Sequence, residues 1–489
     1  MQFPMLTWTI AFALVSLAAG YEANFSEKDA LREVCSGMWA NANTFINVSF
    51  SDDSTGRLAM VIYEFEDIHL IGKVTNTDPD YPQRTYVCTS DALRAQLCDI
   101  SMLGKFIVEL PGGKTLNETS IWSDSIGFQV NSTIGSTSSR PGDGPAGGNP
   151  NGPINSTTNL ALSPSYPRQS LPSDPGVIYN GPIHYVVPKK GYYCVGTVPV
   201  TLVESSPTTT PTHASFKGTV LFRNAFDGQL PAADYPKIMF YFVMTLLYLA
   251  IGGGWGFLCY KHKEEIVPIQ FYVSALIGFL IMEMFANWAY YRYLNAHGGG
   301  VTSTAFLIVV AILDAGRNAL SFFLLLVVSL GLSVVREELP SMTRCKALAI
   351  AHFCFGVMYA IAVVEIELET VSVTIVIFFV LPLAFTLTAF LLWIMYGLQG
   401  TIGELASRKQ TYKLSMFRRL HIILTLAMLV ILGFFVVTSL SFSSRYKEDF
   451  AAQSWPYRWW LMDGYLTILY LLVFSSIAFL WRPTGHNRR

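Results

Sequence analysis

Apolar residues are concentrated in the C-terminal half of the chain, where they form seven long runs. The first run, Ile238–Tyr260, holds 23 residues without a formal charge. A helix needs about 20 apolar residues to cross a hydrocarbon core of about 30 Å. The pattern therefore predicts a seven-helix transmembrane bundle over residues 238–481, and its six further runs are Ile266–Ala289, Ala305–Val335, Ala347–Val364, Val371–Leu398, Leu420–Leu440 and Trp459–Trp481.

Residues 21–226 follow a different pattern, in which short β-branched or aromatic runs alternate with turn residues. Several short strands at this spacing are typical of a β-sandwich, so we expect an all-β domain here. Its expected strands are Thr44–Phe50, Leu58–Phe65, Lys105–Leu110, Ile121–Val130, Ile183–Val187, Tyr192–Leu202 and Ser215–Phe222.

Two segments of this N-terminal half are not expected to belong to the sandwich. Residues 134–174 are dominated by Gly, Pro, Ser and Asn without an apolar period, which predicts a disordered insertion between strands. Residues 1–20 contain the apolar run Trp8–Ala19 and end in Ala18-Ala19-Gly20, which predicts a cleaved signal peptide. The alternative, a first transmembrane helix, is disfavoured because the run is too short to span a bilayer.

A polar collar over residues 227–237 separates the sandwich from the bundle. Its prolines, Pro231 and Pro236, prevent the first helix from extending toward the N-terminus. A signal peptide followed by seven spans places the sandwich in the lumen and residues 482–489 in the cytosol as a tail.

The distribution of Lys and Arg gives the same orientation through the positive-inside rule. Five basic residues flank the predicted luminal ends: Lys237, Arg292, Arg445, Lys447 and Arg458. Thirteen lie in the predicted cytosolic segments: Lys261, Lys263, Arg336, Arg344, Lys346, Arg408, Lys409, Lys413, Arg418, Arg419, Arg482, Arg488 and Arg489.

Sequons and cysteines also indicate a luminal N-terminal domain. The five N-glycosylation sequons all precede Phe226, at Asn24, Asn47, Asn117, Asn131 and Asn155. Four of the seven cysteines lie in this domain, an even number that is compatible with two disulfides in an oxidising compartment. Three pairings are possible, of which we favour Cys88–Cys98 as a local loop and Cys35–Cys194 as a staple between the ends of the domain.

Ionisable residues inside the spans are the sharpest functional signal, because each is costly in hydrocarbon unless paired or hydrated. Asp314 and Arg317 lie three residues apart on one face of the third span. A functional interpretation is a polar cavity that conducts ions or senses protons or a ligand head group, and the alternative is mutual neutralisation that fixes helix register. The predicted intramembrane polar cluster comprises Glu283, Asp314, Arg317, Glu365 and Asp463, with His352 near the start of the fourth span.

Composition and motifs argue against several other functions. The chain is 52% hydrophobic and 14% charged with a net charge of −1, so no global field favours nucleic acid. Metal-ligand pairs such as Cys-x-x-Cys, a Ser-centred nucleophile elbow and paired catalytic carboxylates are missing, which gives no support for an enzyme, a metal or a cofactor. A rhodopsin-type receptor is disfavoured because the third span ends SLGLSVVREEL and the seventh has no Asn-Pro-x-x-Tyr.

Three stretches resemble the lung seven-transmembrane receptor family, also called Golgi-dynamics-domain seven-transmembrane proteins, and the overall pattern is that of a fungal member. They are FRNAFDGQLPAADYPKIMFYFVMTLLY from Phe222, DAGRNALSFFLLLVVSLGLSVVREEL from Asp314, and RWWLMDGYLTILYLLVFSSIAFLWRPTGHNRR from Arg458. The resemblance covers Phe222–Arg489 well and the N-terminal domain in plan only.

The resemblance implies residence in Golgi and endosomal membranes and a role in protein trafficking, with a fold similar to that of the lipid-cargo carrier Wntless. Implied partners are membrane lipids and luminal or lipidated cargo proteins. Ion conduction has been proposed for some relatives. We therefore expect a cargo- or lipid-binding sorting factor, with a cation channel or proton-sensitive transporter as the alternative and a signalling receptor third.

Overall fold

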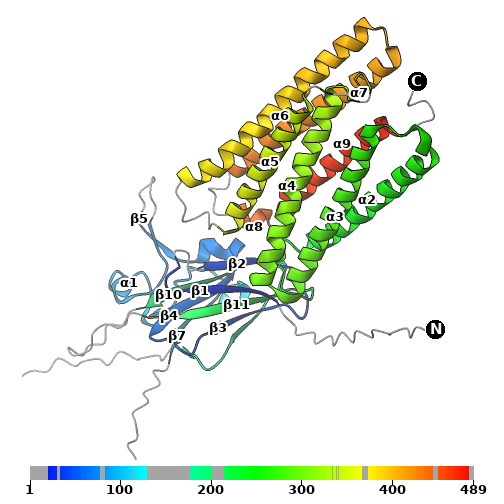
Figure 1. The fold of residues 1–489 in the computed structure, drawn as a ribbon. Coiled ribbons are helices and arrows are strands. Elements are labelled where there is room, and N and C mark those ends of the chain that lie inside the picture. The colour runs from blue at the N-terminus through cyan, green and yellow to red at the C-terminus, as the bar shows by residue number, and fades with distance from the viewer. Residues whose placement is uncertain are drawn as a thin grey trace, which may run out of the picture.

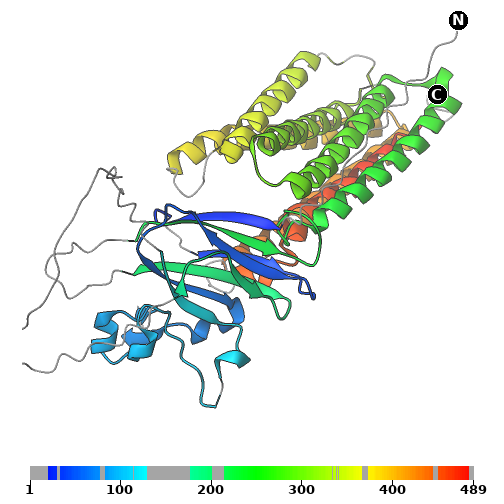
Figure 2. The ribbon, with the colours of Figure 1, turned by 90° about the horizontal axis from the view of Figure 1, so that it is seen from below.

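The computed structural model describes residues 20–29, 33–76, 83–113, 115–128, 177–200, 214–332, 334–336, 339, 341–365, 373–443 and 450–483. The predicted insertion and all but the last residue of the predicted signal peptide lie outside these residues. The N-terminal part is an all-β sandwich that lies at one end of a helical bundle (Figure 1). The view from below also shows the strands gathered at one end of the helices (Figure 2).

The sandwich consists of two mainly antiparallel sheets packed face to face. Apolar residues alternate along β3, where Ile46 and Val48 point into the shared core and Asn47 points outward. This period of two is what a sheet with one buried face requires. One sheet has the order β1 (Tyr21–Ser26), β11 (Lys217–Arg223), β3 (Phe45–Phe50), β9 (Ile183–Val186), and the other β2 (Glu33–Met38), β10 (Gly191–Val200), β4 (Arg57–Glu64), β7 (Trp122–Gly127), β8 (Val177–Ile178).

Strand β4 is buried on both faces, which explains its nearly continuous apolar sequence RLAMVIYE. Leu58 and Met60 face the core between the sheets, whereas Val61 belongs to a second cluster on the outer face. That outer face is covered by short elements: η1 (Phe65–Leu70), β5 (Lys73–Asn76), β6 (Gln83–Thr85), α1 (Ser90–Arg94), η2 (Ile100–Met102) and η3 (Leu116–Glu118).

Six of the seven predicted strands form, one does not, and five observed strands were not predicted: β1, β2 and the shorter β5, β6 and β8. Lys105–Leu110 was expected as a strand, but it makes only isolated bridges at Phe106 and Val108 because it caps the outer cluster instead of joining a sheet. Strands β1 and β2 were not predicted, since their sequences YEANFS and EVCSGM lack a β-branched run. Both form full strands through pairing with β11 and β10.

Six helices of the described residues are long and apolar enough to cross a membrane. A seventh span follows, where the π-helical turn η6 (Trp460–Gly464) runs into the shorter α9 (Tyr465–Leu480), so that residues 458–480 form one continuous helix. The others are α2 (Pro236–Lys261), α3 (Pro268–His297), α4 (Val301–Ser329), α5 (Met342–Glu365), α6 (Val373–Ser407) and α7 (Thr411–Ser443), with the short η4 (Lys263–Glu265) and α8 (Phe450–Ser454) between spans.

The third span ends six residues earlier than the expected boundary at Val335, because α4 stops at Ser329. Gly331 adopts a left-handed conformation with φ of 81°. Its N–H donates to Val328 O at 2.9 Å, and Leu332 N–H donates to Val327 O at 3.2 Å. These two bonds form a Schellman motif, which terminates the helix although the following residues are apolar.

Within the described residues, contacts between the sandwich and the bundle fall in two places. In the collar, Gln229 N–H donates to Asn295 O of α3 at 2.8 Å, and Asn295 Nδ2 donates to Asp227 O at 3.0 Å. In the second contact, the rings of Trp39 after β2 and Trp455 after α8 meet edge to face at 5.1 Å. Both contacts lie at the end of the bundle to which the sandwich attaches, here called the sandwich end.

Candidate functional site

A cluster of three charged side chains lies at mid-depth in the bundle. Glu283 is near the middle of α3, and Asp314 and Arg317 are near the middle of α4. Positions three apart on a helix share a face, so Arg317 can turn toward Asp314 while reaching across to α3. The predicted proximity of these three residues is what the structure shows.

Arg317 bonds both carboxylates. Its Nη1 donates to Glu283 Oε1 at 2.7 Å, and its Nη2 donates to Asp314 Oδ1. The side chain of Glu283 is 1% exposed and that of Arg317 17%, whereas that of Asp314 is 48% exposed. The cluster is therefore closed at Glu283 and open at Asp314, with a polar edge on a surface that is otherwise apolar.

The closed side of the cluster contains polar atoms without hydrogen-bond partners. Within the described part of the chain, these include Glu283 Oε2, Arg317 Nε and the hydroxyl of Tyr248 on α2. Buried polar atoms are normally satisfied, so unpaired ones at one place indicate room for a polar group or water. Tyr470 of α9 lies under the guanidinium, 5.3 Å from Arg317 Cζ to the ring centroid, and its hydroxyl is 2.6 Å from Ser321 Oγ.

Asp463 was predicted to belong to this cluster but lies in a separate polar group at the sandwich end. Its Oδ2 is 2.6 Å from Nζ of Lys237, which also contacts Asp234 Oδ1 at 3.0 Å and donates to the Tyr291 hydroxyl at 3.3 Å. The reason is helix position, since Asp463 begins the seventh span and Lys237 begins the first. Tyr241, stacked on Tyr291 at 5.6 Å, lies between the two groups.

Of the two remaining predicted polar residues, only His352 has a described side chain, and it joins neither group. Glu365 ends α5, and its side chain lies outside the described part of the structure. His352 is buried between α5 and α6, where its Nδ1 is 2.9 Å from Thr386 Oγ1 and its ring packs edge-on against Phe322 and Phe390. These contacts make His352 a packed core residue.

Sequence reasoning missed Lys237, Tyr248 and Tyr470 as members of these groups. A tyrosine in an apolar span gives no signal of its own, because it is common in cores and at interfaces. Lys237 was counted only as a flanking charge, yet its position directly after Pro236 at the start of a span was a usable clue.

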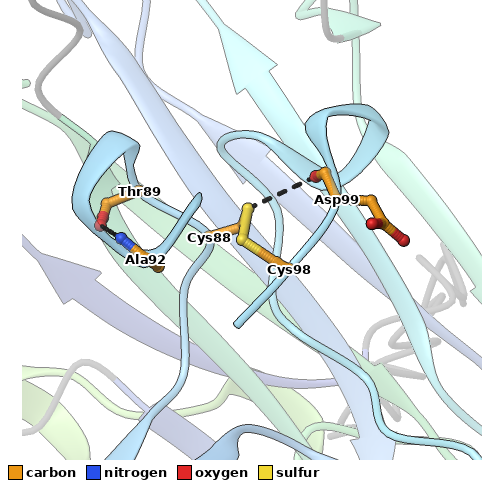
Figure 3. The surroundings of a disulfide bond; sticks show 5 residues. All are labelled: Cys88, Thr89, Ala92, Cys98 and Asp99. Atoms are coloured by element: carbon orange, nitrogen blue, oxygen red, sulfur yellow. Dashed lines mark hydrogen bonds between the residues drawn. A yellow bond between two sulfur atoms is a disulfide. The ribbon is translucent and has the colours of Figure 1, made fainter. Parts of the chain in front are cut away.

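Both disulfides have the pairing that the sequence analysis favoured. Cys35 and Cys194 are directly opposite on β2 and β10, and they join positions 159 residues apart. Cys88–Cys98 closes a local loop around α1, whose N-cap Thr89 accepts from Ala92 N–H at 3.2 Å (Figure 3). Cys88 Sγ also lies 3.7 Å from Asp99 O, a contact and not a hydrogen bond, because a disulfide sulfur carries no proton.

Three of the five sequon asparagines lie in described segments. Asn24 is exposed on β1, and Asn47 is half-buried on β3 with its Oδ1 2.7 Å from His184 Nδ1. Asn117 lies in η3. Asn131 and Asn155 lie outside the described residues, so the structure gives no placement for them.

A β-sandwich with one cross-strand disulfide and one local disulfide, joined by a polar collar to seven helices with charges at mid-depth, defines a multipass membrane protein with an N-terminal globular domain. Residues 236–488 match the model of the GOST seven-transmembrane domain family. The chain belongs to this family, which confirms the predicted resemblance. Residues 31–137 match the model of the PTM1-like N-terminal domain.

Individual relatives agree with this assignment. Membrane protein PTM1 of Saccharomyces cerevisiae is 26% identical over 99% of this chain and 83% of its own length. Transmembrane protein 87A of Xenopus tropicalis is 28% identical over 54% of this chain and 47% of its own length. Transmembrane protein 87B of Mus musculus is 30% identical over 54% of this chain and 46% of its own length. These descriptions name membrane proteins and no enzymatic activity.

Proposed function

We propose that this protein acts in membrane traffic in the Golgi and endosomes, as a sorting factor that binds lipid or lipidated cargo within its bundle and luminal cargo through its sandwich. The observation that supports the proposal best is the half-exposed carboxylate of Asp314 at mid-depth in a membrane-spanning helix. Arg317 and Asn318 bond Asp314, yet the exposed part of a charged group at this depth remains costly unless a further polar partner or water reaches it. The polar part of a lipid or of a lipidated cargo protein has the chemistry to be that partner.

The unpaired atoms on the closed side extend the same argument. Arg317 Nε can donate to a phosphate or carbonyl oxygen, while Glu283 Oε2 can accept from an amine or hydroxyl. A ligand with both donor and acceptor groups fits this set better than a simple ion does.

A headgroup probe tests the intramembrane part of the proposal. The full chain is placed in nanodiscs with a phospholipid that carries a photoreactive group on its headgroup, and crosslinked peptides are mapped. We expect crosslinks in α4 around Asp314, which Asp314→Leu removes. Thr388→Val, which alters an exposed hydroxyl on α6, is the matched control and should leave them. Crosslinks confined to the helix ends would contradict the proposal.

Proximity labelling from the sandwich tests the trafficking role in cells. A labelling enzyme inserted in the N-terminal domain should enrich luminal cargo over a signal-peptide control, and Asp314→Leu should reduce that enrichment. Endoglycosidase treatment provides the orientation test, because Asn-to-Gln changes at the five sequons should remove the mass shift. A native protein without glycans in a glycosylating cell would argue against a luminal sandwich.

Ion transport is the second candidate, and the two polar groups linked by Tyr241 favour it. They line the bundle from Lys237 at the sandwich end to Glu283 at mid-depth. Purified protein in vesicles should then carry a current or proton flux that Glu283→Gln alters without unfolding the bundle. If the wild type carries no flux and the headgroup crosslinks are found, ion transport is contradicted and the sorting role is supported.

A further inference from the structure

A buried ion pair lies in the sandwich, outside the site described above. Glu64 ends β4 with its side chain 4% exposed, and its Oε2 is 2.5 Å from Nζ of Lys189 in the turn between β9 and β10. Lys189 is 54% exposed and also contacts Glu66 Oε2 at 3.1 Å. Glu64 packs so closely against Gly191 that a β-carbon there would lie 2.3 Å from Glu64 Oε1. The turn is held by this ion pair and by the Tyr193 hydroxyl, which donates to Lys189 O at 2.9 Å.

Every element around Glu64 contributes a titratable group. Besides Lys189 and Glu66, these are Asp67 of η1, Tyr185 of β9 and Tyr193 of β10. Ser120 connects them: Glu64 N–H donates to Ser120 Oγ at 2.9 Å, and Ser120 N–H donates to Asp67 Oδ2 at 3.0 Å. Lys189 is the single cation in this group.

The next residue along the turn contacts the bundle. Nζ of Lys190 lies 3.9 Å from the ring centroid of Trp39 and 5.7 Å from that of Trp455. Trp455 is buried and packs on Gly37 of β2, where any side chain would collide with its indole. Cation–π contacts of this kind are attractive and depend on the position of the ammonium group.

We propose that the turn Pro188–Gly191 is an acid-sensitive latch between the two domains. Lys189 anchors the turn to Glu64, and Lys190 holds Trp455 of the bundle against Trp39. When Glu64 takes up a proton, the ion pair is lost, the turn gains freedom, and Lys190 no longer holds the two indoles together. The sandwich then docks less firmly on the bundle.

The electrostatics of the pair agree with this sequence of events. Burial raises the pKa of Glu64 above the usual carboxyl range, although Lys189 opposes the shift. The hydrogen bond to Glu64 in turn raises the pKa of Lys189, so the lysine stays charged. Because the folded state binds the Glu64 proton more tightly than the unfolded state, acid favours the folded sandwich as far as this group is concerned. The latch can thus open while the sandwich remains folded.

Hydrogen exchange of the full chain in nanodiscs tests the latch, with rates corrected for the intrinsic effect of pH. At a pH below the raised pKa of Glu64, amides of residues 190–194 and 450–457 should exchange about fivefold faster than at neutral pH, the size expected when one cation–π contact is lost. The far ends of β3 and β11, where Phe50 pairs with Gly218, lie away from the turn and report that the sandwich stays folded. Glu64→Gln should show the fast exchange at both pH values.

Two further variants distinguish release of the latch from a non-specific rise in hydrogen exchange at low pH. Glu66→Gln removes the exposed partner of the same lysine and should keep the pH response. Lys190→Ala removes the contact with the indoles directly and should give fast exchange at both pH values even if Glu64→Gln does not fold. The proposal is overturned if Glu64→Gln retains the wild-type pH response, or if Lys190→Ala leaves residues 450–457 fully protected.

Discussion

Glu283 in the bundle and Glu64 in the sandwich are two buried carboxylates with different surroundings. Each is almost completely buried and each is bonded to one cation. The cation of Glu64 is Lys189, which is 54% exposed, whereas that of Glu283 is Arg317, which is 17% exposed in a membrane-spanning helix. Lys189 can turn to water if its partner is lost, but Arg317 cannot. In the sandwich, the carboxylate of the pair can therefore be removed without leaving its partner buried and unpaired. In the bundle, removing Arg317 leaves the carboxylate of Glu283 buried without the cation that it bonds.

The largest expected effect is that of Arg317→Ala, which leaves the buried carboxylate of Glu283 without another described cation to bond. We expect it to destabilise the bundle by about 3–5 kcal/mol, as breaking a buried pair from one side does. The double variant Arg317→Gln with Glu283→Gln should recover most of this loss, because both buried charges are gone. Thermal unfolding in detergent measures both proteins. A double variant as unstable as the single one would show that the cluster is not held by its charges.

Lys189→Met should cost less, about 1–3 kcal/mol at neutral pH, because Glu64 can take up a proton once its partner is lost. Glu64→Gln should cost less still, since the half-exposed lysine that remains can bind Glu66 or water. Chemical denaturation of the full chain, followed by a probe in the sandwich, measures this asymmetry. Equal losses of unfolding free energy in the two variants would contradict the view that only the carboxylate of Glu64, and not the ammonium group of Lys189, is unable to reach water.

The pH dependence of the sandwich should follow from Glu64. Its raised pKa means that the unfavourable burial of its charge is present above that pKa and is relieved as pH falls through it. The wild type should therefore gain stability relative to Glu64→Gln as pH falls through the raised pKa of Glu64. The difference between the two unfolding curves cancels the titration of other groups. If the stability of the wild type relative to Glu64→Gln increased with rising pH, the prediction would be contradicted.

Asp314→Asn should have the smallest effect, below about 1 kcal/mol, because Asp314 is half-exposed and Arg317 keeps its bond to Glu283. Its stability is expected to remain near that of the wild type even though the headgroup crosslinks change. Thermal unfolding and crosslinking of one preparation measure both quantities. A loss as large as that of Arg317→Ala would place Asp314 in the structural core of the cluster.

The sequence predicted the seven spans because long apolar runs have few alternative structures. It predicted the pairing of Asp314 with Arg317 because positions three apart on a helix must meet. Glu283 was expected to need a polar partner, because an unpaired charge is costly in hydrocarbon. Which residue pairs with it depends on how α3 and α4 pack, and the sequence does not specify that packing. Tertiary packing also decided that Asp463 meets Lys237, which no local pattern could specify.

In the sandwich, prediction failed where neighbouring strands override local preference. Strand β2 has the weak sequence EVCSGM, yet it pairs with β10 over six residues, including Cys35 opposite Cys194. The end of α4 was missed for the opposite reason, because apolar residues continue past the turn at Gly331. The latch could not have been predicted at all, since Glu64, Trp39 and Trp455 are far apart in the sequence.

The Cys35–Cys194 bond has a consequence for the covalent topology of the chain. It encloses residues 36–193, while the helices of the described residues that are capable of spanning a membrane all lie after residue 235. A protease that cut once between Cys98 and Cys194 would produce two chains, and only the C-terminal chain would carry the spans. The N-terminal chain would then be attached to the membrane covalently through a single sulfur–sulfur bond. Reduction would convert that protein from one molecule into two, leaving only the pairing between strands to hold the N-terminal chain in place.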